Sequence, residues 1–210
     1  MPQGRRGKYL GFVAHEIKNP LATVLWACDL LKRMEKADRS GERAEKMIDV
    51  SLRSLRRMRR LIDDYFTIER LLEHGYELRR ERIELRELLG QALEQLADKD
   101  GIATEGWSVE VQGELMGDPD MLKRALRSLL EHMARGSEKA RLTLTAAAGE
   151  LRIAAEQPPS PLIPPEPEER PSGDATGGVL GFALAARILE EHGARIEERE
   201  GVLCVRFAAA

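Results

Sequence analysis

The chain has 210 residues, of which 42% are apolar, and its 33 Lys and Arg against 36 Asp and Glu give a formal net charge of -3. This length fits one large domain or two small ones, and the mixed charge gives no reason to expect nucleic acid or an anionic membrane as a partner. No run approaches the roughly 20 apolar residues of a membrane span, and the N-terminus lacks a signal peptide's apolar core, so we expect a cytoplasmic protein.

Two cysteines, Cys28 and Cys204, lie far apart without a CxxC motif or a His at ligand spacing. Neither a disulfide framework nor a zinc site is therefore expected. We predict both cysteines to be small buried hydrophobic residues.

The first third of the chain has the pattern of two long amphipathic helices. Apolar residues recur at steps of three and four over residues 10–31 and again over 48–68, with a polar break at 37–41 and a stop at Gly75. This spacing predicts an antiparallel helical hairpin. The apolar faces are wider than one hairpin can cover, so we expect two copies to pair into a four-helix bundle; the widening residues include Leu25, Leu61 and Leu72.

Five arginines between positions 53 and 60 resemble a nucleic-acid patch at first sight. Leu55 and Met58 interrupt the run at helical spacing, which favours a solvated helix face.

After Gly75 the pattern changes to alternating helices and strands, which predicts a mixed α/β domain over residues 76–210 behind the hairpin of residues 1–75. Asp118 followed by Pro119 predicts a helix N-cap with proline at the first helical position. Seven prolines between 157 and 171 predict a loop. The remaining expected elements, in chain order, are a helix over 85–96, a strand over 107–111, a helix to Met133, strands over 141–146 and 151–155 around a turn at Gly149, a helix ending at His192 and Gly193, and a strand over 202–207.

The most specific motif is Phe-Val-Ala-His-Glu-Ile-Lys-Asn-Pro-Leu, residues 12–21, near the start of the first helix. His15 lies off the apolar stripe, so its imidazole should face solvent. A neutral imidazole is a good nucleophile near neutral pH, and a phosphoramidate is labile enough to pass its phosphoryl group on. The segment resembles the H-box of two-component sensor histidine kinases, in the HisKA-type dimerisation and phosphoacceptor domain. An isolated histidine would be interpreted as a solvated surface residue, but the matching neighbours favour a phosphorylatable one.

Two residues near His15 complete the expected catalytic set. Glu16 can hydrogen-bond the ring or accept its proton, and Asn19, one helical turn beyond His15, could position a water molecule. The resemblance implies that this Glu-x-x-Asn pattern supports dephosphorylation of a response regulator. Pro20 is expected to bend the helix just past the site.

The second domain resembles a degenerate form of the ATPase domain of the same family, the Bergerat (GHKL) α/β sandwich, which makes the overall class α+β. Where the family has two asparagines in its N-box, this chain has Ser128 and His132. Imidazole is a poor ligand for magnesium, which prefers oxygen. His132 also has no partner at metal-ligand spacing, so no metal site is expected.

The other nucleotide-binding motifs depart from the family in the same direction. The adenine-reading Asp-x-Gly-x-Gly is replaced by Pro158, Ser160 and Leu162, and the last glycine box keeps Gly177 and Gly181 but has Val179 between them. Between Pro165 and Gly177 there is too little chain for the usual lid over the phosphates. The resemblance therefore implies a retained fold, a lost ATP site and no cofactor.

These observations favour a dimeric histidine phosphotransferase of a phosphorelay, in which His15 exchanges phosphoryl groups with Asp residues of response-regulator receiver domains and phosphatase activity is compatible. One alternative is a non-catalytic module that binds a response regulator or a separate histidine kinase, with His15 a relic. A working ATP-dependent kinase would need the missing Asp and Asn. Because Met1 stands only 14 residues before His15, we expect no sensor segment and an input from another protein.

Overall fold

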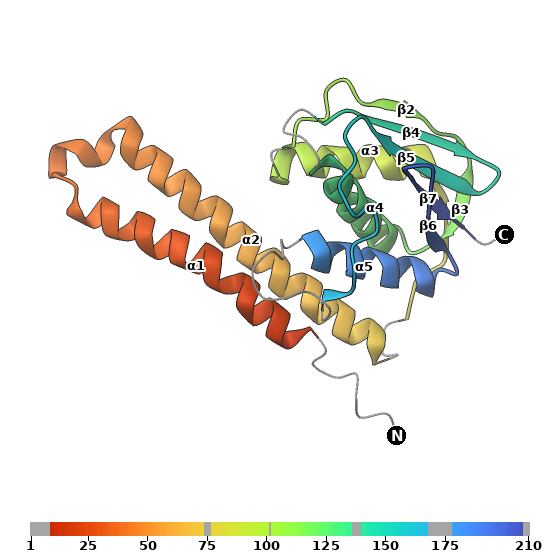
Figure 1. Cartoon of the computed structure of the whole chain (residues 1–210), viewed down its shortest axis with the longest axis horizontal. Coiled ribbons are helices and arrows are strands. Elements are labelled where there is room, and N and C mark those ends of the chain that lie inside the picture. Colours follow the sequence, from red (N-terminus) through yellow and green to blue (C-terminus); the bar gives the residue numbers. More distant parts are fainter. Residues whose placement is uncertain (1–8, 74–76, 101, 136–139, 168–177, 208–210) are drawn as a thin grey trace.

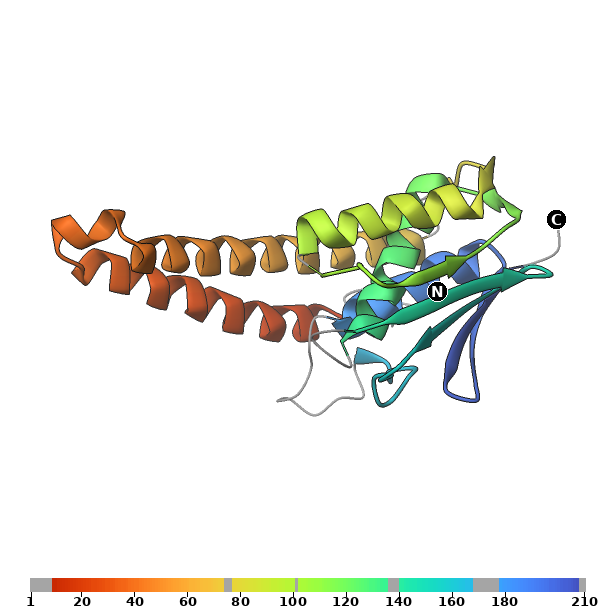
Figure 2. The same ribbon diagram turned by 90° about the horizontal axis from the view of Figure 1, so that it is seen from above.

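In a computed structural model of the protein, a long helical hairpin projects from a mixed α/β domain (Figure 1). The view from above shows the hairpin extending away from the domain (Figure 2). The predicted fold class is confirmed, and the predicted helices and strands occur in the predicted order, with two short strands in addition. The structure describes residues 9–73, 77–100, 102–135, 140–167 and 178–207. The predicted helix stop at Gly75 and the first glycine of the last box, Gly177, lie outside these residues.

The hairpin consists of helices α1 (Leu10–Arg33) and α2 (Glu42–Leu72), joined by a 3-10 turn at Lys36–Ser40. Helix α1 continues through Pro20 without interruption. Small and apolar side chains recur along both helices at steps that place them on one helix face, and this face is buried. The buried residues include Val13, Pro20, Ala27, Ala44, Met58 and Leu61. In the described part of the chain, no helix is both long and apolar enough to cross a membrane.

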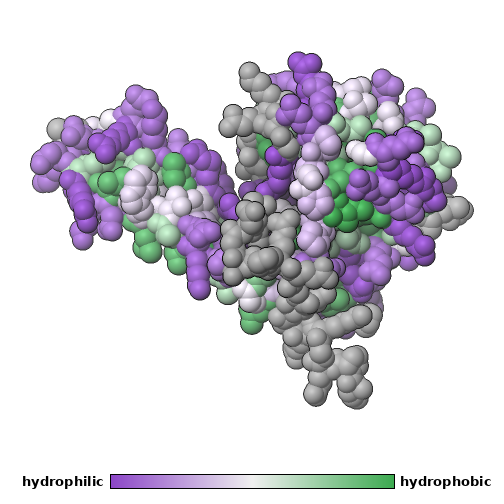
Figure 3. Space-filling model, viewed as in Figure 1, coloured by the Kyte–Doolittle hydropathy of each residue, from purple (hydrophilic) through white to green (hydrophobic). Residues whose placement is uncertain are grey.

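The hairpin leaves a row of large apolar side chains exposed to solvent, and Figure 3 shows apolar surface among the charged residues of this arm. The α2 members are 40% to 58% exposed and follow one another at helical steps. We call this set the apolar row: Ile48, Leu52, Leu55, Ile62 and Phe66 on α2, with Leu10, Leu21 and Leu25 on α1. Cys28 is exposed, contrary to the prediction, because its helical position places it beside Leu21 and Leu25 on this face, whereas Cys204 is buried as predicted.

The main sheet has five strands in the order β2-β4-β5-β7-β6, and only the pairing of β2 with β4 is parallel. The strands span Ser108–Glu110 (β2), Leu142–Ala147 (β4), Glu150–Ala155 (β5), Arg195–Arg199 (β6) and Val202–Arg206 (β7). The predicted turn between β4 and β5 is confirmed: Ala148 and Gly149 both have positive φ angles, of 49° and 78°. Such a pair of left-handed residues matches the twist of a two-residue hairpin.

A second, two-stranded antiparallel sheet joins β1 (Glu81–Glu84) to β3 (Glu114–Gly117). This sheet was not predicted, because both strands are four residues long and too polar to show a period. Three helices, α3 (Leu85–Gln95), α4 (Pro119–Ala134) and α5 (Gly178–Glu191), cover one face of the main sheet (Figure 2). Their hydrophobic core also includes residues from the base of the hairpin; these are Tyr9, Val13, Leu61, Ile68 and Leu71.

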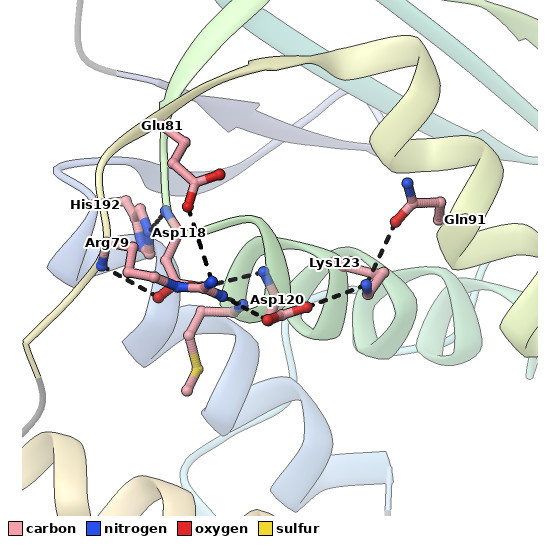
Figure 4. A network of polar contacts seen from close by, with 8 residues as sticks. Arg79, Glu81, Gln91, Asp118, Asp120, Lys123 and His192 are labelled. Carbon is pink, nitrogen blue, oxygen red and sulfur yellow. Dashed lines mark hydrogen bonds and ion pairs between the residues drawn. The ribbon is translucent and has the colours of Figure 1, made fainter.

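A polar network fixes the start of α4 (Figure 4). The Asp118 carboxylate accepts hydrogen bonds from the backbone amides of Asp120 and Met121, each at 3.1 Å, which confirms the predicted N-cap. The backbone amide of Asp118 donates to Nε2 of His192 at 3.0 Å, while Nδ1 of His192 lies 2.7 Å from the carbonyl oxygen of Ile188. A ring that accepts at Nε2 and donates at Nδ1 is neutral. The network thus joins the first turn of α4 to the end of α5.

Charged side chains extend this network at the surface. Hydrogen bonds from Lys123 and Arg79 hold the pKa of Asp120 below its usual range, and Lys123 also reaches Gln91 on α3 at 3.4 Å (Figure 4). Because all these groups bind one another, we assign them a role in stabilising the fold.

Candidate phosphoacceptor site and candidate nucleotide site

His15 lies in the second turn of α1 with its side chain exposed to solvent, as predicted. Asn19 is four positions further along and is also exposed, so the two side chains share one helix face. Within the described part of the chain, His15 makes no hydrogen bond or ion pair. The geometry leaves the imidazole free to meet a reactive group on another molecule.

Glu16 points in a different direction from His15. Its side chain is only 3% exposed, and Oε2 lies 3.3 Å from Nη2 of Arg57 on α2. Consecutive side chains on a helix are about 100° apart, which is why Glu16 enters the hairpin while His15 faces solvent. The structure therefore ties α1 to α2 immediately beside the candidate phosphoacceptor. The expected contact between Glu16 and the His15 ring stays a prediction.

Arg57 was not singled out by the sequence, where it was one of five arginines assigned to a solvated face. That assignment holds for Arg53, Arg56 and Arg59, which are exposed. Arg57, whose side chain is 44% exposed, and Arg60 also line a cavity between the hairpin and the α/β domain. Their separation of three residues puts them on one helix face, but Arg53 and Arg56 have the same separation, so the sequence alone does not distinguish the two pairs.

The face of α1 that carries His15 is not the face that carries the apolar row. His15 follows Leu10 by five positions, which rotates it by roughly 140° about the helix axis. Trp26 follows His15 by eleven positions, about three full turns, so it returns to the same side. Its indole is 56% exposed. We call His15, Asn19 and Trp26 the His15 face; sequence analysis did not use Trp26.

Ser128 and His132, which were predicted to stand in place of the N-box asparagines, both lie on α4 and are buried. The imidazole of His132 lies with Nε2 2.9 Å from the carbonyl oxygen of Leu162 and packs edge-on against Phe182, with ring centroids 5.0 Å apart. Because a carbonyl oxygen can only accept, Nε2 is the protonated nitrogen. His132 thus connects α4 to the loop before residue 167 and to α5.

The other residues predicted to stand at nucleotide-binding positions are divided between surface and core. Pro158 and Ser160 are exposed in the loop after β5, whereas Leu162 and Val179 are buried. Gly181 lies in the first turns of α5, where an added Cβ would be 3.6 Å from Oγ of Ser128 and 4.0 Å from Oδ2 of Asp64. The structure therefore brings Ser128 and Gly181 together and places a residue of the hairpin beside them.

That hairpin residue, Asp64 on α2, forms a buried polar contact with α4. Its Oδ1 accepts a hydrogen bond from Nη2 of Arg124 at 2.6 Å, and Nη1 of Arg124 donates to Oγ1 of Thr67 at 2.9 Å. Burial raises the pKa of Asp64, and the Arg124 guanidinium opposes that rise. Helix α2 consequently covers the side of α4 and α5 on which Ser128 and Gly181 lie.

Comparison with known proteins supports the HisKA-type hairpin and the overall fold. Residues 5–74 match the family described as the His Kinase A (phospho-acceptor) domain. The sensor protein VanS of Enterococcus faecium is 24% identical over an alignment 212 positions long, which covers 93% of this chain and 54% of VanS. The chain spans about half or less of the length of the curated relatives it matches.

Two solved structures share the fold. The Acinetobacter baumannii histidine kinase AdeS aligns with a TM-score of 0.65 at 15% identity, covering 92% of this chain and 97% of AdeS. The histidine kinase ThkA, solved in complex with the response regulator protein TrrA, aligns with a TM-score of 0.59 at 22% identity, covering 96% of this chain and 60% of ThkA. A helical hairpin followed by an α/β domain is therefore an arrangement found in histidine kinases.

Proposed function

We propose that this chain, a two-component protein with a HisKA phosphoacceptor domain, acts as a dimeric histidine phosphotransferase that exchanges phosphoryl groups between His15 and aspartates of receiver domains. The observation that carries the proposal is the exposed His15 inside a matching H-box. In the forward step, the imidazole attacks the phosphorus of an aspartyl phosphate, a P–N bond forms, and the P–O bond to the aspartate breaks. The reverse step regenerates the neutral imidazole.

The partner in this proposal is a receiver domain. The ThkA structure contains a histidine kinase together with a response regulator protein. In this chain, the His15 face is an exposed surface to which a receiver domain could bind. A half-exposed indole such as Trp26 supplies a large apolar contact at low entropic cost, which is typical of residues that dominate binding energy. We propose that the receiver binds across His15, Asn19 and Trp26.

The dimer in this proposal uses the apolar row. Exposed large apolar side chains in one contiguous strip are typical of an interaction surface, and two such hairpins facing each other would form a four-helix bundle. His15 and Trp26 lie on the other side of α1, so dimerisation leaves the His15 face open. We propose further that the hairpin of residues 1–75 carries the chemistry and the domain of residues 76–210 supports it.

We also propose that the chain does not use magnesium and ATP. His132 replaces an amide that would present an oxygen to the metal, and its Nε2 hydrogen is directed at the Leu162 carbonyl. The exposed Pro158 and Ser160 offer no carboxylate to adenine, and Asp64 of α2 lies where Gly181 approaches Ser128. These residues do not fit a magnesium nucleotide, because several charged or polar contacts would have to be replaced at once, each worth about 1.5 to 3 kcal/mol.

The decisive experiment incubates the full chain with a panel of phosphorylated receiver domains, with and without magnesium and ATP. We expect one receiver to label the protein without ATP, and His15→Ala to abolish the label while the dimer and the melting temperature are unchanged. Labelling of His15 by ATP alone would contradict the loss of the nucleotide site. Tight receiver binding without transfer would favour the non-catalytic module instead.

A further inference from the structure

A cavity opens at the end of the α/β domain that lies away from the hairpin, beside the turn between β4 and β5 (Figures 1 and 2). Its volume is about 370 Å³, which falls within the roughly 300 to 1,000 Å³ of small-molecule sites. Its walls include segments far apart in the sequence: the start of α3, strand β3, the turn between β4 and β5, and the residues after α5 and β7. None of the lining residues that the structure describes belongs to the hairpin or to the nucleotide motifs. The cavity is therefore separate from the His15 face and from the candidate nucleotide site.

The cavity combines apolar side chains with an open strand edge. Leu85 and Leu115, which are 6% and 8% exposed, form part of its wall, and the small Ala146 and Ala147 leave its interior unfilled. Strand β3 pairs only with β1 among the described strands, so its second edge has no strand partner. Because the consecutive residues 112–116 all line the cavity although successive side chains point to opposite faces, the wall includes backbone of this segment. Such a wall suits a compact apolar ligand with a few polar groups.

One charged group of the wall lacks a counter-charge within the part of the chain that the structure describes. Oε2 of Glu114 lies 3.3 Å from Nη1 of Arg82, and Oε2 of Glu150 lies 3.1 Å from Nη2 of Arg206. Arg80 is an exposed lining residue and forms no hydrogen bond or ion pair with any described residue. Because both carboxylates of the wall are already paired, the electrostatic potential beside Arg80 favours an anion. The cavity thus offers an apolar space next to an available guanidinium.

We propose that this cavity binds a small organic anion, whose carboxylate pairs with Arg80 and whose compact apolar body packs against the leucines of the wall. A planar guanidinium binds a carboxylate through two parallel hydrogen bonds, so Arg80 selects the charged end of the ligand. His192 also lines the cavity, and its Nε2 accepts the Asp118 amide in the network that fixes the start of α4 (Figure 4). The ligand therefore lies beside that network. This inference does not depend on phosphotransfer at His15.

The test is a titration of the isotopically labelled full chain with benzoate, followed by NMR of the backbone amides. Benzoate should shift the amides of Gly113 and Gly149, which line the cavity, and leave that of Gly201, at the far end of β7, unshifted. Two matched probes separate the contributions: benzamide keeps the ring without the charge, and acetate keeps the charge without the ring. Each should bind at least about tenfold more weakly than benzoate, because each lacks one of the two contacts.

Two variants test the wall itself. Arg80→Met should weaken benzoate binding at least about tenfold without changing the melting temperature, because the guanidinium has no partner to lose among the described residues. Ala147→Phe, at an exposed position of the wall, fills the space and should abolish the shifts. Arg86→Met removes an exposed arginine outside the cavity and should bind benzoate as the wild type does. Unshifted Gly113 and Gly149, equal binding of benzoate and either matched probe, or undiminished binding by either wall variant would overturn the proposal.

Discussion

Arg57 reaches from α2 to the buried carboxylate of Glu16, with Nη2 3.3 Å from Oε2, one position after His15. The contact joins the two helices where the candidate phosphoacceptor stands. We expect Arg57→Met to lower the free energy of unfolding by about 1 to 3 kcal/mol, because it leaves a buried carboxylate without its charged partner. Urea unfolding measures this loss. Arg53→Met is the matched control and should change stability by less than about 0.5 kcal/mol; equal losses in the two variants would mean that the Glu16 contact does not stabilise the hairpin.

The burial of Asp64 should make stability depend on pH. Burial raises the pKa of Asp64, so the contribution of this carboxyl is complete below its unfolded pKa and is lost as the pH rises through its folded pKa. Arg124→Met removes the group that opposes the rise. We expect it to cost about 3 to 5 kcal/mol at neutral pH, where the carboxylate is left buried and unpaired, and less in acid.

Urea unfolding of Arg124→Met at neutral and acidic pH checks this prediction. Adding Asp64→Asn to Arg124→Met should restore most of the lost stability at neutral pH, since no buried charge then remains. A deficit that is the same at both pH values would show that Asp64 is not the responsible group.

Trp26 and Leu25 are adjacent, similarly exposed at 56% and 59%, and on different faces of α1. We expect Trp26→Ala to weaken binding of the phosphorylated receiver by about thirtyfold, which corresponds to ~2 kcal/mol for a residue that dominates an interface. Leu25→Ala should leave receiver binding unchanged and weaken the dimer. Transfer rates measured against receiver concentration, together with sedimentation, separate the two effects. Equal effects of both variants on receiver binding would refute the assignment of separate faces.

The apolar row predicts a charge-sensitive dimer. Leu55→Glu should give a monomer at micromolar concentration, because each hairpin would place an unpaired carboxylate in an apolar contact. Analytical ultracentrifugation is the measurement. Arg53→Glu changes charge on the same helix away from the row and should remain dimeric. A dimeric Leu55→Glu protein would exclude this face as the interface.

Asn19 should affect hydrolysis of the phosphorylated receiver and not transfer of the phosphoryl group to His15. If its amide positions water one turn from His15, Asn19→Ala should still acquire the phosphoryl group at the normal rate and should slow the loss of phosphate from the receiver. A time course of radiolabel on both proteins distinguishes the two steps. Slower labelling of His15 in this variant would instead make Asn19 part of the transfer step.

The sequence by itself determined the elements whose signals are local. The steps of three and four gave the two hairpin helices, Asp118 and Pro119 gave the start of α4, and the turn at Gly149 set the register of β4 and β5. It also placed His15 on the solvent side of α1, because helical periodicity fixes which face a residue occupies.

Only the tertiary structure decided which polar groups meet. Glu16 and Arg57 are 41 residues apart, Arg124 and Asp64 are 60 apart, and His132 and Leu162 are 30 apart, so no local pattern links them. The cavity that Arg57 and Arg60 line likewise joins residues of three helices. Periodicity predicts the direction in which a side chain leaves its own helix. The residue that it contacts depends on how the helices pack against one another, and the whole hydrophobic core determines that packing.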